Sequence, residues 1–312
     1  MAFAPATGRR RACSIGGNAR VAAILNQAVI QKLTDTASLV NHPSILQLRA
    51  MNGSGSTVVQ VPVVSWGADS MAAVAENASV SNTALTSTNA NITIARQALR
   101  RQISDLAQLT ATGIPLDVTI DNLASDMVAA YNKRVSTMIC ALSSGFSTSV
   151  GSTGVDLSVS TFYSGMFALQ LQSANGPFTA ILHPQQLNDL MSSLRSETGP
   201  GQYIAANQEM LLAKGQGFAG TLYGVDIFKS SFVPTANAGA DYLGMMIAPG
   251  AIGVATGTAA PIIGATTVLA QSPIVVEAER DASNGSTIIV GSAFVGVGEI
   301  DDAKGVGILS DF

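Results

Sequence analysis

Regular hydrophobic spacing is longest in the middle of the chain. Between Leu116 and Leu142 apolar residues recur in steps of three and four, which is the spacing of one face of an α-helix. They are Leu116, Ile120, Leu123, Met127, Tyr131, Val135, Met138 and Leu142. Pro115 suits the start of a helix, where a missing N–H costs nothing. The pattern predicts one helix of about 40 Å, long enough to be the spine of a flat domain.

Two β-branched segments ahead of this helix predict strands. They are residues 56–64, where Pro62 argues for an edge or a bend, and residues 91–97. Residues 65–90 between them are small and polar, and they contain Glu76, one aspartate and no basic residue. Such a segment is too polar to build a core of its own. We therefore expect a long hairpin arm that lies on a neighbouring molecule.

The remaining pattern predicts a mixture of helices and strands. A helix is expected at residues 18–33 and an extended segment at 42–50. After a Ser/Thr/Gly linker at 145–154, a second unit should contain helices at 160–172 and from Pro184, loop and helix at 202–214, and strands at 178–182, 220–229 and 242–247. Residues 249–256 are expected to form a short turn or helix. The last elements are strands at 272–280, 286–297 and 306–309, with a hairpin turn at Asn284-Gly285.

Composition adds an argument about assembly. Only 12% of the residues are charged, against about 25% in ordinary globular proteins. So little charge cannot cover a large solvated surface, yet no stretch reaches the roughly 18 apolar residues that a membrane helix needs. We expect that other subunits cover much of the surface, as in an obligate homo-oligomer. With 312 residues the chain can build two cores or one elaborated fold.

The charge that is present is unevenly placed. Arg9, Arg10, Arg11 and Arg20 lie ahead of the first acidic residue, whereas acidic residues outnumber basic ones in the rest of the chain. A basic arm on an acidic body indicates contact with an anionic partner, such as packaged nucleic acid or an acidic scaffold, and a solvated tail is the alternative. The first 20 residues lack the apolar segment of a secretion signal.

Few residues carry catalytic or metal-binding chemistry. The two histidines are His42 and His183, and His183, ahead of Pro184, fits a helix cap better than a general base. The two cysteines are Cys13 and Cys140, and Cys140 lies in the long helical pattern, where a buried inert thiol is expected. Neither a zinc site nor a disulfide framework is expected. We predict no catalytic, cofactor-binding or metal-binding site, and hence no enzyme.

Three weaker patterns are better explained by structure than by chemistry. Gly215–Gly220 has the spacing of a dinucleotide-binding loop, but a helical segment precedes it and a strand follows, which reverses the order that phosphate binding needs. The acids Asp117, Asp121 and Asp126 complement the dipole of the long helix near its start. Asp301-Asp302 is expected to be a solvated turn rather than a cation site.

Taken in order, these elements resemble the major capsid proteins of tailed bacteriophages, whose fold is called the Hong Kong 97 fold. The shared parts are a basic N-terminal arm, an extended hairpin (the E-loop), a spine helix, a second domain (the A-domain), and a return through a β-hairpin to the spine domain (the P-domain). Four segments look similar: Ala75-Glu76-Asn77-Ala78 near the loop tip, residues 94–106, residues 178–187, and residues 220–230, where Asp226 replaces the family's proline.

The resemblance implies an α+β, Hong Kong 97-like capsid fold over about residues 40–312. The division it implies is N-terminal arm and helix 1–40, P-domain lead-in 41–55, E-loop 56–97, P-domain spine helix 98–155, A-domain 156–261, and P-domain return strands 262–312. It implies contacts between subunits through the E-loop, for which we expect Trp66, Met71 and Glu76, and an interior-facing basic arm. Some family members cross-link neighbours through an E-loop lysine; this loop has none, so that chemistry is not expected.

The expected function is that of a structural major capsid protein, which assembles as pentamers and hexamers into the icosahedral head of a tailed phage around double-stranded DNA. Expected partners are other copies, scaffolding, portal and decoration proteins, and packaged DNA by non-specific contact, without a membrane. The expected location is the virion capsid, after synthesis in the host bacterial cytoplasm. The alternatives are an encapsulin-type nanocompartment shell protein and a secreted β-rich adhesin.

Overall fold

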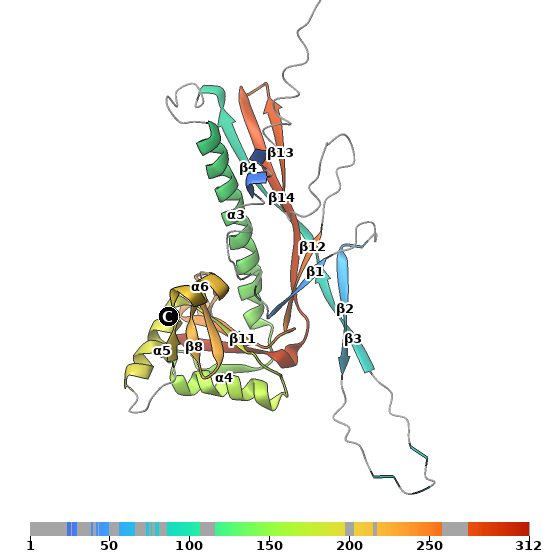
Figure 1. Ribbon diagram of the computed structural model, residues 1–312, viewed down its shortest axis with the longest axis vertical. Coiled ribbons are helices and arrows are strands. Elements are labelled where there is room, and N and C mark those ends of the chain that lie inside the picture. The colour runs from blue at the N-terminus through green and yellow to red at the C-terminus, as the bar shows by residue number, and fades with distance from the viewer. Residues whose placement is uncertain are drawn as a thin grey trace, which may run out of the picture.

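The computed structural model describes residues 24–25, 27–29, 39, 42, 44–49, 56–65, 73–74, 76, 79–80, 86–106, 116–196, 203–214, 217–257 and 274–311. Within these residues the chain forms two β-sheets, a separate two-stranded hairpin and one long helix that runs beside the first sheet (Figure 1). The fold is α+β, as predicted. The arginines Arg9, Arg10, Arg11 and Arg20 and the side chains of Cys13, Trp66 and Met71 lie outside the described residues.

The long helix, α3, spans Leu116–Ala141, which confirms the helix predicted from the hydrophobic spacing. A 3-10 turn, η2 (Leu142–Ser144), follows it. Buried residues repeat along one face at the spacing of three and four: Ala124, Met127, Val128, Tyr131, Val135 and Ile139. They belong to the larger core, which also contains Ile274, Ile289 and Val295 of the first sheet. The apolar stripe of α3 therefore packs against the first sheet.

The first sheet is built around its longest strand. It contains β1 (Ile45–Arg49), β4 (Ala95–Ser104), β12 (Ile252–Gly257), β13 (Ile274–Asp281) and β14 (Ser286–Glu299). β14 pairs antiparallel with β4, β12 and β13, and β1 adds to β12 in parallel. The turn predicted at Asn284-Gly285 does connect β13 to β14, with Gly285 at a φ of +54°.

One predicted element in this sheet is wrong. Residues 249–256 were expected to form a turn or helix, but Ile252–Gly257 is strand β12. Its first four residues are buried, and it lies between β1 and β14. Pro249, Gly250 and Gly253 locally favour a turn, although Ile252 and Val254 are typical strand residues. Pairing on both sides with strands distant in sequence overrides this preference.

The second sheet carries helices on both faces, with α4 and α5 on one and α6 on the other. Its strands are β5 (Ser149–Gly151), β6 (Thr179–Leu182), β7 (Tyr203–Ala205), β8 (Phe218–Leu222), β9 (Val225–Lys229), β10 (Thr235–Ala236), β11 (Asp241–Ile247) and β15 (Gly305–Asp311). The helices are α4 (Val159–Leu171), α5 (Pro184–Ser196) and α6 (Gln208–Lys214), with 3-10 turns η3 (Asn237–Gly239) and η4 (Asp302–Lys304). Phe162 and Leu169 of α4 and Leu190 of α5 form a second core with the strands beneath them. The helices predicted for this region are confirmed, but the strand predicted at 220–229 is two antiparallel strands, β8 and β9. β5, β7 and β10 were not predicted, and β5 lies in the predicted linker.

The hairpin predicted ahead of the long helix is also present. β2 (Val58–Ser65) and β3 (Thr86–Thr93) pair antiparallel, and the hairpin projects away from the rest of the molecule (Figure 1). The strand predicted at 91–97 is in fact two strands, because the chain passes from β3 to β4 at Ile94. The N–H of Ile94 donates to the carbonyl of Thr57 over 2.8 Å, which closes the hairpin at its root. The predicted domain boundaries stay a prediction.

Candidate functional site

The root of the hairpin is held by one side chain, Ile92 of β3, which is 1% exposed. Gly298 of β14 and Gly253 of β12 make room for it. A Cβ at Gly298 would lie 2.8 Å from the Ile92 side chain, and a Cβ at Gly253 would lie 2.9 Å from it. Both distances are shorter than van der Waals contact, so a methyl group at either position would collide with Ile92. The two glycines therefore form a notch that accepts the Ile92 side chain. The notch sets the direction in which the hairpin leaves the body.

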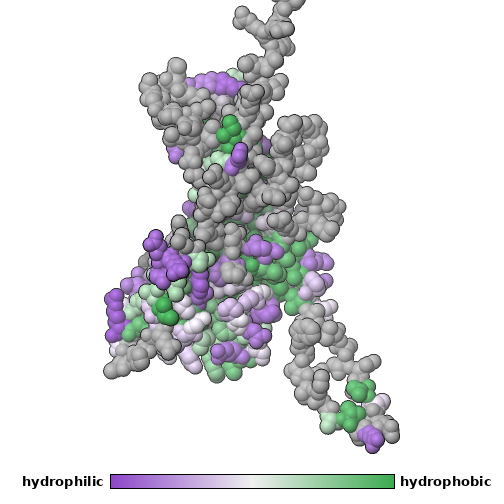
Figure 2. Space-filling model, viewed as in Figure 1, coloured by the Kyte–Doolittle hydropathy of each residue, from purple (hydrophilic) through white to green (hydrophobic). Residues whose placement is uncertain are grey.

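The far end of the hairpin exposes apolar side chains beside a carboxylate. Val74 is 49% exposed and Val80 is 76% exposed, and Glu76 between them lies in an exposed turn. Figure 2 shows apolar surface next to hydrophilic surface at this end of the hairpin. Of the three residues predicted to contact a neighbour, Glu76 is therefore placed at the tip and accessible. Exposed valines on a projecting arm are typical of a surface that another molecule covers.

A second exposed apolar surface runs along α4. Tyr163, Phe167 and Leu171 follow one another at intervals of four residues on the outer face of the helix, and each is exposed. Tyr223, from the turn between β8 and β9, meets the Tyr163 ring edge to face at 6.0 Å. The helix contains no charged residue. The sequence reasoning missed this stripe, although its spacing of four residues was readable.

The outer surface of α3 and β4 is positively charged. Arg101 of β4 pairs with Asp126 of α3, with 2.6 Å between Nε and Oδ2. The hydrogen bonds from Arg101 hold the pKa of the Asp126 carboxyl below its usual value. Asp126, predicted to act through the helix dipole, therefore has a specific partner. In the described part of the chain no carboxylate pairs with four other exposed cations nearby, Arg96, Arg100, Lys133 and Arg134.

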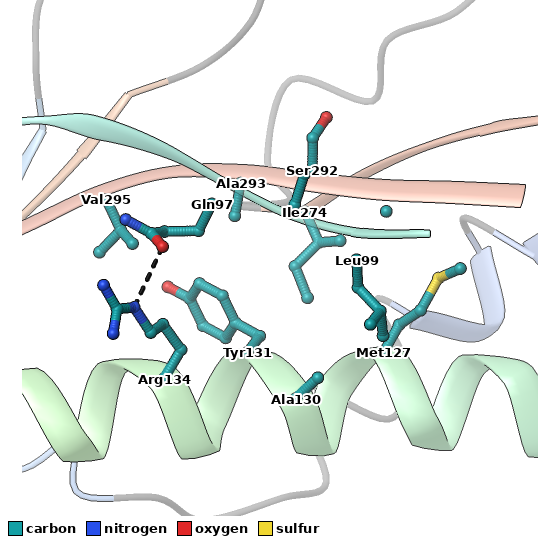
Figure 3. A pocket seen from close by; sticks show the side chains of 12 residues that line it. Gln97, Leu99, Met127, Ala130, Tyr131, Arg134, Ile274, Ser292, Ala293 and Val295 are labelled. Carbon is teal, nitrogen blue, oxygen red and sulfur yellow. Dashed lines mark hydrogen bonds between the residues drawn. The ribbon is translucent and has the colours of Figure 1, made fainter. Parts of the chain in front are cut away.

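A cavity of about 190 Å³ lies between α3 and the first sheet (Figure 3). Its lining is mostly apolar, and the polar groups are at one end. There the Nε of Arg134 donates to the side-chain oxygen of Gln97 over 3.0 Å. The Tyr131 ring extends through the cavity towards this pair. Burial raises the pKa of Tyr131 to about 12, so its hydroxyl is neutral at ordinary pH.

His183 caps the start of α5, as predicted. Its Nδ1 accepts from the backbone N–H of Gln185 over 3.2 Å, which caps the first turn of the helix. The ring stacks on Tyr242 with 3.7 Å between centroids. Burial lowers the pKa of His183, so the neutral form that this cap needs is favoured. The contacts that His183 makes here are therefore those of a helix cap.

The first turn of α5 also carries a fully buried amide, Gln186. Its Nε2 lies 3.2 Å from the carbonyl oxygens of Tyr242 and Ile308 and 2.9 Å from the hydroxyl of Ser310. Its side-chain oxygen accepts from the N–H of His183 over 3.1 Å. One side chain thus joins α5 to β11 and β15. The sequence did not predict this link to β11 and β15, because the partners of Nε2 are 56 to 124 residues away.

His42 lies at the junction of the two sheets. Its Nδ1 accepts from the N–H of Ser44 over 3.2 Å, and its ring meets Phe228 of β9 edge to face at 4.4 Å. Burial is the main cause of a lowered His42 pKa, with Asp226 acting in the opposite direction and Lys214 in the same one. His42, like His183, is therefore kept in its neutral form, and its contacts are structural.

The other candidate groups also serve the fold. Cys140 is buried, and burial raises its pKa to about 11, as expected for an inert thiol. The glycine-rich segment follows α6 and precedes β8, the order that argued against a dinucleotide loop. Asp301 and Asp302 accept hydrogen bonds from Ala303 and Ser147 respectively, and Asp301 pairs with Lys304.

Across the described ranges no cluster of His, Cys, Asp or Glu could hold a metal ion. No helix among those residues has the length and apolar character to cross a membrane.

Comparison with known proteins finds similarity at the level of three-dimensional structure. No protein-family model matches the chain, and no curated protein matches its sequence. The capsid of Ralstonia phage GP4 matches with a TM-score of 0.61 at 11% identity, over 86% of this chain and 87% of that one. The capsid of the cyanophage P-SCSP1u matches with a TM-score of 0.58 at 14% identity, over 88% of both chains.

A nanocompartment shell matches equally well. The encapsulin of Synechococcus elongatus gives a TM-score of 0.59 at 10% identity, over 85% of this chain and 84% of that one. The chain therefore has the fold of the tailed-phage major capsid proteins, which this encapsulin also has. The predicted Hong Kong 97-like capsid fold is confirmed.

Proposed function

We propose that this chain, which has the fold of a capsid-type shell subunit, is a major capsid protein that assembles into the icosahedral head of a tailed phage around double-stranded DNA. The observation that supports this most is the projecting β2–β3 hairpin, whose tip exposes apolar side chains that nothing in the same chain covers among the described residues. The apolar stripe on α4 and the low charge content point the same way. The role is structural rather than enzymatic.

Charge supports a specific use of the hairpin. In our proposal it is the E-loop, and Trp66, Met71 and Glu76 contact the next subunit. The exposed carboxylate of Glu76 complements the positively charged surface of α3 and β4, which the same chain presents elsewhere. Contacts between a tip and a different surface of the next copy are heterologous, and such contacts form rings where the rotation between copies closes. Rings of five and six subunits are the pentamers and hexamers of the proposed shell.

The N-terminal arginines complete the proposal. Arg9, Arg10, Arg11 and Arg20 would face the interior and neutralise packaged DNA or an acidic scaffold without sequence preference. Scaffolding, portal and decoration proteins are the other proposed partners. The subunit would be made in the host cytoplasm and reside in the virion capsid, with the domain division given above.

Electron microscopy of the purified protein, expressed alone and with neighbouring genes, tests the proposal. We expect closed shells or rings of five and six subunits. A monomer under both conditions would contradict the shell function. Removal of residues 1–17 should reduce the nucleic acid in purified particles, and an unchanged content would refute the role of the arm.

Two substitutions test the loop contact. Trp66→Ala and Glu76→Gln should lower the yield of shells, because each removes a proposed contact with the next subunit. Glu209→Gln removes a carboxylate from the exposed start of α6 and is the matched control. Equal yields for Glu76→Gln, Trp66→Ala and this control would remove Trp66 and Glu76 from the contact while leaving the shell function intact.

An encapsulin-type shell is the second candidate, favoured by the match to the Synechococcus encapsulin. The contents of purified shells separate the two functions. Double-stranded DNA supports the phage capsid, whereas an enclosed protein cargo without DNA supports the encapsulin. The fold gives no support to a secreted adhesin.

A further inference from the structure

Small residues line the cavity between α3 and the first sheet. They are Ala130 of α3 and Ala293 of β14, on opposite sides of it in Figure 3, and Gly291 of β14. A Cβ at Gly291 would lie 3.1 Å from the sulfur of Met127. A methyl group at this position would therefore contact Met127 rather than fill the cavity. At about 190 Å³ the cavity exceeds an engineered cavity of roughly 150 Å³ that binds benzene. It is therefore large enough for a small organic molecule.

The two ends of the cavity differ in chemistry. One end is lined by Leu99, Met127 and Ile274, with Met127 and Ile274 almost fully buried. The other end presents Gln97, Arg134 and the ring of Tyr131, and Figure 3 shows these three gathered there. An apolar body with a few polar groups converging at one point is the usual composition of a small-molecule site. With apolar residues at one end and polar residues at the other, the cavity fits a molecule that has one apolar and one polar end.

The polar end favours an anion. Arg134 uses its Nε for Gln97, and in the described part of the chain its terminal nitrogens have no partner. The lining contains no carboxylate that could neutralise it. A guanidinium with two free N–H groups in a plane matches a carboxylate, which it can bind at two points.

We propose that this cavity binds a short amphipathic carboxylate, with an apolar body of about six to eight carbon atoms, whose head group pairs with Arg134. The tail occupies the space between Ala130, Met127 and Ile274. The Gln97 amide and the Tyr131 hydroxyl donate to the same head group. The ligand contacts both α3 and the sheet, so it stabilises their packing, and the gain rises with the logarithm of ligand concentration above the Kd.

The lining argues against a peptide as the occupant. A peptide segment would carry backbone N–H and C=O groups into a cavity whose deep end offers no hydrogen-bond partner, and such groups are costly to bury. Water is a poor occupant of the apolar end for the same reason, since a buried water needs two to four polar partners. An alkyl chain has no such requirement.

Titration calorimetry of the full chain with sodium octanoate tests this inference. We expect saturable binding of one octanoate per chain, weaker binding of 1-octanol, which lacks the charge, and no binding of acetate, which lacks the tail. Arg134→Gln should weaken octanoate binding by about tenfold or more, the cost of losing a charged hydrogen bond. Arg134→Lys should weaken it less. Lys133→Gln removes the same charge from the adjacent exposed position, outside the lining, and should bind as the wild type does.

A filled cavity provides the second test. Ala130→Leu places a larger side chain in the cavity and should abolish octanoate binding while the chain keeps its circular dichroism spectrum. Unchanged binding by Ala130→Leu, or equal weakening by Arg134→Gln and Lys133→Gln, would overturn the site. So would wild-type protein that binds no octanoate. If a synthetic peptide of residues 73–80 binds instead, and Arg134→Gln abolishes this, the occupant is the hairpin tip of a second copy. None of these results depends on whether the chain forms shells.

Discussion

The hydroxyl of Ser44 and the hydroxyl of Thr179 are hydrogen-bonded over 2.8 Å, although the two residues are 135 positions apart. Both side chains are buried. Ser44 immediately precedes β1 of the first sheet, and Thr179 begins β6 of the second. This contact therefore joins the two sheets, and with His42 and Phe228 it makes one body of them.

The Ser44–Thr179 contact should be measurable as a coupling energy. Ser44→Ala leaves the Thr179 hydroxyl buried without its partner, so we expect a loss of about 1–3 kcal/mol in the free energy of unfolding. Thr179→Val should cost a similar amount. The double variant should lose less than the sum of both, because it removes donor and acceptor together. Denaturant unfolding followed by circular dichroism gives the three values, and strict additivity would contradict the contact.

Gln186 should matter far more than its neighbour. Gln186→Leu leaves the buried carbonyls of Tyr242 and Ile308 without their side-chain donor, and we expect a loss of about 3 kcal/mol or more. Gln185→Leu changes the exposed residue beside it, whose side chain lies outside this network, and should cost about 0.5 kcal/mol at most. Thermal unfolding of both variants makes the comparison. Equal unfolding temperatures would show that the buried amide does not join the helix to the strands.

The two histidines make stability depend on pH. Burial lowers the pKa of His42 and of His183 below the ordinary value of 6.5. The unfolded chain therefore binds protons more readily than the folded chain, so stability is fully present above pH 6.5 and is lost as pH falls through the folded-state pKa values. His42→Gln and His183→Gln should each flatten this dependence. Unfolding free energies measured from pH 8 to pH 5 check the sign, and a stability that rises on acidification would contradict it.

The glycine notch should control the hairpin. In Gly298→Ala the new methyl group would lie 2.8 Å from Ile92, so we expect Ile92 to be displaced, at a cost of about 1–3 kcal/mol. Proteolysis at the root of the hairpin should become faster, and the yield of shells should fall. Gly217→Ala is the control, because its Cβ would lie 3.5 Å from the nearest atom. The same cleavage rate in both variants would mean that the notch does not hold the hairpin.

The sequence by itself determined the elements whose signal is local. The spacing from Leu116 to Leu142 predicted α3, since a buried face on a helix requires apolar residues at that interval. Asn284-Gly285 predicted the turn between β13 and β14, and His183-Pro184 predicted a capped helix start. The order of these elements resembles that of the tailed-phage major capsid proteins, and this resemblance predicted the capsid-type fold.

The tertiary structure alone decided which of these elements meet. Residues 252–257 form a strand because β1 and β14, from opposite ends of the chain, lie on either side of them. Gln186, the Ser44–Thr179 contact and the Arg101–Asp126 pair join residues 25 to 135 positions apart. The cavity beside Arg134 is formed by α3 and three strands. Periodicity and turn signals report only on residues close in sequence, whereas packing and long-range pairing bring distant residues together, so contacts of this kind appear only once the chain has folded.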